Sequence, residues 1–548
     1  MQNKRTYSAF LACLLGSACG GASQAPSLGA PGPAHPGQPY ESDSSDAYEE
    51  GESEVAEGTA IAAGAPMLAQ NVATRSVPTP VSPQTKIAAA TGGDRYQTLA
   101  ENSYTKTAQE DTSTFSIDVD TASYSNIRRY LRANQLPPAS AVRTEELINY
   151  FNYDYQGPSE SDPFSIHTEL SPAPWHEKHQ LLKVGLQGYR MDTADLPARN
   201  LVFLIDTSGS MSSHDKLGLL KQGFGQLTQS LREEDHVSIV AYAGSAGVVL
   251  APTSGADKQT ITAALDNLSS GGSTNGGQGI ELAYRLAAEN FNPNAINRII
   301  LASDGDFNVG MTSKNALIEL VEKKRKHGTY LSVLGFGRGN LNDATMEQIA
   351  DKGNGNYSYI DSAAEARKVL VDEGGSTLVT IAKDVKIQVQ FNSKAVESYR
   401  LIGYENRVLA NKDFDNDKVD AGELGPGHSV TALYEVVPRK GAHSQKPVSI
   451  RLRYKRPNQT KSKLLVHQAK AAARGVAEPS RDMRFASAVA GFGMLLSGSA
   501  HKGTLNWADL QAMAEDAVGS DSSVHRQEFL ELIGIAAGLS RPEAQVAR

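Results

Sequence analysis

Short apolar runs alternate with longer amphipathic segments through the middle of the chain. The runs have the length of buried strands and lie at residues 201–205, 237–242, 299–302 and 330–334. The segments between them, such as 217–231 and 316–326, carry apolar residues at helical spacing. This alternation predicts an α/β domain at residues 196–375, with a mostly parallel, doubly wound, Rossmann-like sheet covered by helices on both faces.

Strands of a different kind flank this central domain. Residues 385–391 and 448–454 alternate apolar with polar side chains, which is the pattern of a strand with one buried face. Two further strands are predicted before the domain, at 165–169 and 182–186. Because one apolar face must be buried against another layer, we expect the flanking strands to join in one β-sandwich into which the central domain is inserted.

A strand followed by a helix is predicted near the start of the folded region. Residues 115–119 alternate as a strand should, and apolar residues of 124–131 then recur at helical spacing. Asp118, Asp120 and Ser123 superficially resemble metal ligands. Residues of these types also cap the start of a helix, and we predict that they do so here.

The first residues have the pattern of an export signal. Lys4 and Arg5 form a short basic region, and residues 7–15 supply an apolar stretch too short to span a bilayer. The following LGSAC resembles a bacterial lipobox, which implies that Cys19 is lipidated and becomes the new N-terminus. By resemblance to other lipoproteins, Gly20 after it favours the outer membrane of the cell envelope. A plain cleaved signal peptide is the alternative.

The segment after the signal is unlike the rest of the chain. It is rich in Ala, Gly, Pro and Ser and carries an acidic block at 41–57, so it buries too little apolar surface to fold. At the other end, apolar residues between 485 and 537 recur at helical spacing. The predicted division is a signal peptide at 1–19, a disordered linker at 20–95, an N-terminal α/β and β-strand domain at 96–195, the central domain at 196–375, a β-rich domain at 376–475 and a C-terminal helical region at 476–548.

The overall charge argues against one class of partner. Lys and Arg number 53 against 61 Asp and Glu, which leaves a formal net charge of -8 over 548 residues. Surfaces that bind nucleic acid are basic, so we expect no nucleic-acid partner.

Oxygen-bearing side chains gather at the expected carboxyl ends of the central strands, where ligands of such sheets bind. LVFLIDTSGSM places Asp206, Ser208 and Ser210 in a DxSxS spacing after the first strand. GGSTN places Thr274 in a glycine-rich loop, and IILASDG places Asp304 just beyond another buried strand. Five hard oxygen donors suit Mg²⁺, with Mn²⁺ or Ca²⁺ as alternatives, and exclude a thiolate zinc site. Capping of loop amides would explain the hydroxyls, but it would not explain two carboxylates on one rim.

In these residues the sequence resembles the von Willebrand factor type A family, whose metal-ion-dependent adhesion site uses DxSxS, a Thr and an Asp in this order. The resemblance implies that Ser208, Ser210 and Thr274 contact the metal by hydroxyl, directly or through water. It also implies that Asp206 and Asp304 act largely through bound water. An ion held by so few direct carboxylates keeps positive charge and an open position, which a partner's Glu or Asp can complete.

The resemblance extends beyond the central domain. Residues 96–540 resemble bacterial lipoproteins in which a von Willebrand type A domain lies between an N-terminal domain and a C-terminal domain of unassigned function. DFDNDKVDAGELGPGHSVTALYEV and RDMRFASAVAGFGMLL are among the matching stretches. In the first of these, Asp413, Asp415 and Asp417 imitate a calcium-binding EF-hand loop, but Lys418 stands where that loop needs Gly. A solvated acidic turn is the expected structure.

Patterns of known enzyme classes are incomplete in this sequence. Asp206 and Thr207 begin like the catalytic triplet of an aspartic protease, but Ser208 stands where Gly is needed and no second copy follows. The chain lacks a GxSxG elbow, a GxxxxGK[ST] loop and a GxGxxG fingerprint. We therefore expect no enzyme.

Two hypotheses of function follow, and a metal-assisted hydrolase is a weaker third. The first is a membrane-anchored protein that binds an acidic residue of a protein partner through Mg²⁺, in adhesion or in envelope assembly. The second is a structural scaffold of an envelope complex, in which the metal only stabilises the fold.

Overall fold

The computed structural model describes residues 86–89, 93–159, 162–192, 195–305, 314–441, 447–457, 459–469, 478–518 and 523–541. The predicted signal peptide, Cys19 and residues 20–85 of the predicted linker lie outside this part of the chain. The linker was predicted to reach residue 95, but β1 (Lys86–Ala89) pairs antiparallel with β2 (Arg95–Thr98) within that range. Residues 86–89, KIAA, show no alternation of polar and apolar residues, so periodicity does not predict this strand.

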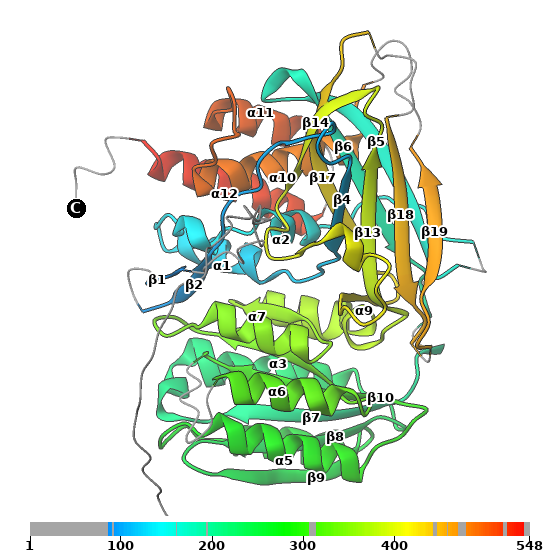
Figure 1. The fold of residues 1–548 in the computed structure, drawn as a ribbon. Helices are drawn as coiled ribbons and strands as arrows, with labels where there is room; N and C mark the ends of the chain where they lie inside the picture. The colour runs from blue at the N-terminus through cyan, green and yellow to red at the C-terminus, as the bar shows by residue number, and fades with distance from the viewer. Residues whose placement is uncertain are drawn as a thin grey trace, which may run out of the picture. The chain divides into compact units, whose positions relative to one another are not determined.

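The central domain contains the expected parallel sheet, drawn in green at the bottom of Figure 1. Its order is β12-β11-β10-β7-β8-β9, and every neighbouring pair is parallel except β8 and β9. The strands are β7 (Arg199–Asp206), β8 (His236–Tyr242), β9 (Ala246–Ser254), β10 (Ile296–Ser303), β11 (Tyr330–Phe336) and β12 (Tyr357–Ile360). The four predicted strands are confirmed, and β9 and β12 are additional strands at the two edges of the sheet.

Helices cover both faces of this sheet, because successive side chains of a strand point to opposite sides. Val202 and Leu204 of β7 belong to one apolar core, together with side chains of α5, α6 and α7. Leu201 and Phe203 belong to the other core, with side chains of α3 and α4. These helices are α3 (Leu219–Gln229), α4 (Lys258–Asp266), α5 (Gly276–Glu289), α6 (Lys314–Arg325) and α7 (Asp343–Lys352).

The flanking strands form the predicted β-sandwich. One sheet has the order β15-β4-β13-β18-β19, with β16 on β13, and the other has the order β3-β14-β17-β6-β5. The strands that precede the central domain are β3 (Thr105–Lys106), β4 (Thr112–Ser116), β5 (Phe164–Ala173) and β6 (His176–Gly188). Those that follow it are β13 (Ala382–Phe391), β14 (Val396–Ile402), β15 (Val408–Leu409), β16 (Gly422–Leu424), β17 (Ser429–Pro438), β18 (Val448–Lys455) and β19 (Lys463–Gln468).

Each sheet of the sandwich contains strands from both sides of the central domain. In one sheet β4 pairs with β13, with Phe115 opposite Ile387, and in the other β6 pairs with β17, with Val184 opposite Ala432. The inward side chains of both sheets share one apolar core. The insertion of the central domain into the sandwich is therefore confirmed, as Figure 1 shows.

Helices from both ends of the chain share a second core beside the sandwich. They are α1 (Ala122–Arg132), α2 (Thr144–Asn149), α10 (Arg481–Ser497), α11 (Trp507–Val518) and α12 (Val524–Leu539). Tyr124 and Ile127 of α1 belong to the same apolar core as Phe485 of α10 and Phe529 of α12. The predicted regions 96–195 and 476–548 therefore do not have separate cores, since their apolar faces cover each other. Among the helices described, none has the length and hydropathy needed to cross a bilayer.

The predicted caps of helix α1 were wrong. The helix begins after Thr121, whose side chain makes no capping hydrogen bond. The amide of Ser123 donates instead to a carboxylate oxygen of Glu146 on α2, at 2.7 Å. Asp118 and Asp120 both face the guanidinium of Arg407, which lies far away in the sequence. Tertiary partners therefore replaced the local interaction that the sequence favoured.

Asp118 and Asp120 belong to a buried charge network that joins the central domain to its flanks. Arg143, which directly precedes α2, pairs with Asp343 and Glu347 of α7, at 2.5 and 3.6 Å. Arg407 pairs with Asp118 at 3.0 Å and also reaches α7, at Glu347 and Asp351. Carboxylates outnumber the two guanidinium groups. Burial raises the pKa of Glu347 to about 8 and that of Glu146 to about 7, and the neighbouring arginines only partly offset this rise.

This network predicts that stability falls as the pH rises. The pKa of Glu347 is about 8 in the folded chain and about 4.3 in an unfolded one, so the folded state binds more protons between these values. The free energy of unfolding is therefore greatest near the pKa of the unfolded chain, and it decreases as the pH rises through the pKa of the folded chain. The melting temperature, measured by differential scanning fluorimetry from pH 5 to pH 8, should therefore decrease. Glu347→Gln should flatten this dependence, because the amide cannot ionise.

The matched control is Glu319→Gln, an exposed glutamate on α6 of the same domain. Its melting curve should follow that of the native protein at every pH. Parallel pH profiles for native protein and Glu347→Gln would contradict the assignment of the raised pKa to this residue.

Candidate metal centre

The DxSxS segment turns sharply where β7 ends. Asp206 is the last residue of the strand, and Ser210 lies in a short 3₁₀ turn, Gly209–Ser212. The carboxylate of Asp206 is fully buried and accepts two hydrogen bonds of 2.9 Å, from the amide of Ser208 and the hydroxyl of Ser303. These bonds fix the carboxylate and bend the chain so that Ser208 and Ser210 come to one side.

The two serine hydroxyls have a spacing that suits an octahedral ion. The Oγ atoms of Ser208 and Ser210 are 3.0 Å apart. Mg²⁺ binds oxygen at about 2.1 Å in octahedral geometry, and two adjacent ligands of such an octahedron are therefore about 3 Å apart. The donor set, all hard oxygen, also fits Mg²⁺. The residues present are thus able to hold the ion that the sequence predicts.

Asp304 meets this segment from the neighbouring strand. It directly follows β10, which pairs in parallel with β7, and its side chain is fully buried. Burial alone would raise the pKa of Asp304, but hydrogen bonds from Asn340, Lys216 and Ser210 hold it below its ordinary value. The carboxylate is therefore ionised beside the serine hydroxyls.

The pKa of Asp206 is shifted in the opposite direction, above its ordinary value. Burial raises its pKa to about 6 despite the hydrogen bonds from Ser208, and the charge of Asp304 adds to the rise. Two carboxylates thus converge on one rim and oppose each other's ionisation. A cation between them would remove this opposition.

The loop that carries Thr274 is fastened to the DxSxS segment by two backbone hydrogen bonds. The amide of Gly271 donates to the carbonyl of Thr207 at 2.8 Å, and the amide of Gly209 donates to the carbonyl of Gly272 at 3.0 Å. Gly272 has φ of +80°, a conformation that favours glycine. These two bonds hold the Thr274 loop against the DxSxS segment, just before α5 begins.

Three residues of the site were not predicted from the sequence. Ser303 could have been suspected, because it is a polar residue inside an apolar strand run next to Asp304. Asn340 and Lys216 carried no such signal, since loops bring them in from far along the chain.

A second group of carboxylates lies close together away from the DxSxS segment. Among the described residues, Asp118, Glu146 and Glu347 offer carboxylate oxygens within 4.8 Å of one another. The guanidinium groups of Arg143 and Arg407 already face these oxygens, as described above. The group is therefore accounted for by ion pairs.

The acidic turn that imitates an EF-hand is also engaged with cations. Asp415 and Asp417 both face the guanidinium of Arg453, at 2.8 and 3.5 Å. The carbonyl oxygens of Asp413 and Asp417 accept hydrogen bonds from lysine side chains of β13 and β18. This arrangement favours the expected acidic turn over a calcium loop.

Comparison with known families covers almost all of the described chain. Residues 200–373 match the von Willebrand factor type A domain, residues 90–183 match a profile described as von Willebrand factor, and residues 376–539 match one described as "Uncharacterized protein YfbK, C-terminal". The Escherichia coli (strain K12) protein YfbK is 43% identical over 474 residues, which covers 82% of this chain and 82% of that protein. The chain belongs to the YfbK family of von Willebrand factor type A proteins.

Solved structures resemble this YfbK-family chain at lower identity. A von Willebrand factor type A protein from Catenulispora acidiphila is 16% identical, with a TM-score of 0.40, over 69% of this chain and 91% of that one. BatB from Bacteroides thetaiotaomicron is 24% identical, with a TM-score of 0.28, over 32% of this chain and 97% of that one. For the YfbK-family chain, membership also means that its central domain is of a kind that commonly binds a divalent metal through an adhesion site.

Proposed function

We propose that this chain binds a protein partner through a divalent cation, preferably Mg²⁺, held by oxygen atoms of Asp206, Ser208, Ser210, Thr274 and Asp304. The observation that carries the proposal is the meeting of two buried carboxylates and a pair of hydroxyls, 3.0 Å apart, at the carboxyl ends of β7 and β10. When bound, the ion would supply a Lewis-acidic position that a partner's Glu or Asp can occupy. The chain's own residues position the ion and leave room for that carboxylate.

The type of ligand decides how strongly the ion attracts a partner. Serine and threonine hydroxyls are neutral, and the two aspartates are fixed by hydrogen bonds from Ser208, Ser303 and Asn340. An ion with neutral direct ligands keeps more of its charge than one wrapped by carboxylates. We propose binding rather than catalysis, because no described side chain around the two aspartates is placed as a general base.

We further propose that the protein is attached to the cell envelope by a lipid on Cys19, at the outer membrane. This part of the proposal rests on the basic and apolar residues that precede LGSAC in the sequence. The acidic stretch at 41–57 would keep the folded part at a distance from the lipid surface, because like charges extend a chain.

A scaffold role is the second candidate function. The favouring observation is the buried ion-pair network between α7 and the flanking residues Arg143 and Arg407, which fastens the central domain rigidly to the sandwich. In this case the flanking domains would carry the partner contacts. Removal of metal would then lower the melting temperature, and partner binding would fall only in so far as the chain unfolds.

The proposal is tested by partner capture with and without metal. The full chain is immobilised and exposed to a solubilised envelope extract in Mg²⁺ or EDTA, and bound proteins are identified by mass spectrometry. We expect partners that are captured in Mg²⁺ only and are lost with Asp206→Ala. Asp266→Ala, which changes an exposed aspartate on α4, is the matched control and should capture as the native chain does. Capture that survives both EDTA and Asp206→Ala would overturn the proposal.

A further inference from the structure

A lysine side chain is built into the rim of the candidate metal centre. Lys216 follows the DxSxS segment in an irregular helical turn, His214–Gly218, and its side chain is buried. The ammonium donates to a carboxylate oxygen of Asp304 at 2.9 Å and to the side-chain oxygen of Asn340 at 3.0 Å. One of the two carboxylates of the site therefore has a cation of the chain itself as its neighbour.

The side chain of Lys216 packs directly against Gly337, which has no β-carbon in the way. A β-carbon on Gly337 would lie 2.3 Å from both Cγ and Cε of Lys216, so the aliphatic stem passes directly over this residue. Gly337 also has φ of +72°, which side-chain-bearing residues rarely adopt. The position of Lys216 thus depends on a glycine just beyond the end of β11.

The loop under the lysine is fastened from β12 of the same domain and by Asp94 from outside the domain. The hydroxyl of Tyr359 donates to the carbonyl of Gly337 at 2.6 Å. A carboxylate oxygen of Asp94 accepts hydrogen bonds from the amides of Gly339 and Leu341, at 2.8 and 3.2 Å. Asn340, which holds the ammonium, lies between these two amides. The lysine is therefore held by a fixed frame and does not extend freely into solvent.

The charge of the site follows from this arrangement. Asp206 and Asp304 contribute two negative charges when both are ionised, and the ammonium of Lys216 offsets one of them. A divalent ion that enters must share Asp304 with a resident cation, which repels it at short range. The same repulsion leaves the bound ion less fully neutralised and more attractive to an outside carboxylate.

We propose that Lys216 is a resident counter-cation of Asp304 that weakens the affinity of the site for divalent metal and keeps net positive charge available for the partner's carboxylate. This inference rests on the proposed function, because it concerns the same ion. It adds that metal occupancy depends on the Mg²⁺ concentration, and that a partner carboxylate and the ion bind more tightly together than separately.

The test is calorimetric titration of the full chain with Mg²⁺ and with Mn²⁺. Lys216→Met removes the charge and keeps the stem, and we expect it to bind either ion about tenfold more tightly or better. Lys323→Met, an exposed lysine on α6, is the matched control for net charge and should bind as the native chain does. Lys216→Gln, which can still donate to Asp304, is the second variant if the methionine chain fails to fold.

Each outcome separates this inference from the function on which it rests. Tighter binding by Lys216→Met, with none by Asp206→Ala, supports both. Binding by Lys216→Met but not by the native chain supports the role of Lys216 and overturns metal-dependent function in the native protein. Equal or weaker binding by folded Lys216→Met and Lys216→Gln overturns the role of Lys216 alone. Failure of every chain to bind overturns both.

Discussion

Replacing Arg128 by Met is expected to lower the free energy of unfolding by about 3–5 kcal/mol, the usual cost of leaving buried charges without their partner. The side chain of Arg128 is only 3% exposed and pairs with Asp361, Glu365 and Glu528. Asp361 and Glu365 belong to the central domain, and Glu528 belongs to α12. Removal of the guanidinium would leave the buried carboxylates of Asp361 and Glu365 without this ion pair, and Glu528 would keep only its pair with the more exposed Arg132. Guanidinium chloride unfolding, followed by circular dichroism, measures the loss.

Arg132→Met is the matched control, one turn further along α1. Arg132 also pairs with Glu528, but its side chain is 52% exposed, so its ion pair is screened by water. Ion pairs at exposed positions contribute about 0–1 kcal/mol, and the control should lose no more than this. Equal small losses for the two variants would contradict a structural role for the buried arginine.

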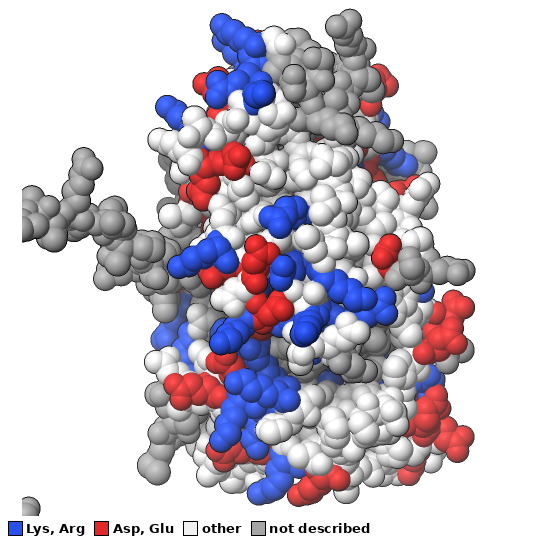
Figure 2. All heavy atoms as spheres, turned by 45° about the vertical axis from the view of Figure 1, so that its right-hand side comes forward, with Lys and Arg blue, Asp and Glu red and all other residues white. Residues whose placement is uncertain are grey.

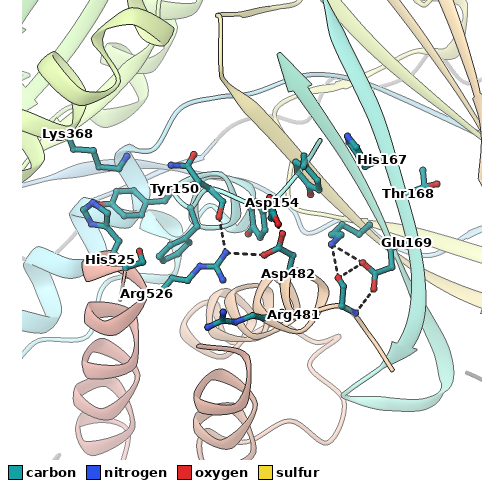
Figure 3. A pocket seen from close by; sticks show the side chains of 17 residues that line it. Tyr150, Asp154, His167, Thr168, Glu169, Lys368, Arg481, Asp482, His525 and Arg526 are labelled. Atoms are coloured by element: carbon teal, nitrogen blue, oxygen red, sulfur yellow. Dashed lines mark hydrogen bonds and ion pairs between the residues drawn. The ribbon is translucent and has the colours of Figure 1, made fainter. Parts of the chain in front are cut away.

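Tyr150, whose hydroxyl accepts a hydrogen bond from Arg128 at 3.0 Å, also lines a cavity that Figure 3 shows from close by. It has a volume of about 730 Å³ and is lined by aromatic and charged side chains, Tyr150, Lys368, Asp482 and Arg526 among them. Two ion pairs lie among the lining residues, one within the C-terminal helices and one within the sandwich: Arg526 faces Asp482 at 3.2 Å, and Lys183 faces Glu169 at 3.0 Å. The amide of Ser480, directly before α10, donates to a carboxylate oxygen of Glu169 at 2.7 Å and so joins the C-terminal helices to the sandwich beside the cavity.

Surface charge is mixed on the face that Figure 2 shows. Blue groups gather over the middle and lower left of this face with red groups set among them, further red groups lie at its lower right edge, and wide areas between are uncharged. This agrees with the formal net charge of -8, which is small for 548 residues. Long-range steering by the whole surface is therefore a weaker source of specificity than the local charge at the candidate metal centre.

The central domain could be predicted from the sequence because its signals are local. A strand such as 201–205 is apolar throughout, since both its faces are covered, and DxSxS follows it directly. The end of the neighbouring parallel strand then places Asp304 at the same edge. Four of the five predicted ligands lie at or just after the carboxyl ends of the parallel strands β7 and β10, which lie at the same edge of the sheet. The fifth, Thr274, lies in a loop fastened to the DxSxS segment.

The features that the sequence did not predict depend on contacts between distant parts of the chain. Asp118 and Asp120 have the sequence pattern of helix caps, but their partner Arg407 lies almost 290 residues away. Lys216 reaches Asp304 only because Gly337 leaves space for its stem. The shared core of α1 and α12 likewise depends on how the ends of the chain meet. Periodicity reports which face is buried and does not report which element covers it.

The central claim, that the hydroxyls of the DxSxS segment bind a metal ion, is tested most directly by calorimetric titration of Mg²⁺ into Ser208→Ala/Ser210→Ala. Loss of groups that merely support metal ligands lowers affinity about 10–100-fold, so loss of two direct ligands should cost about a hundredfold or more. Ser212→Ala/Ser245→Ala, with two exposed serines of nearby loops, is the matched control.

We predict one bound ion per chain for the native protein and the control, and no measurable heat from the double variant at the same concentrations. Circular dichroism should show that all three chains are folded. Native-like affinity in Ser208→Ala/Ser210→Ala would contradict the account, since the ion would then be bound by other residues.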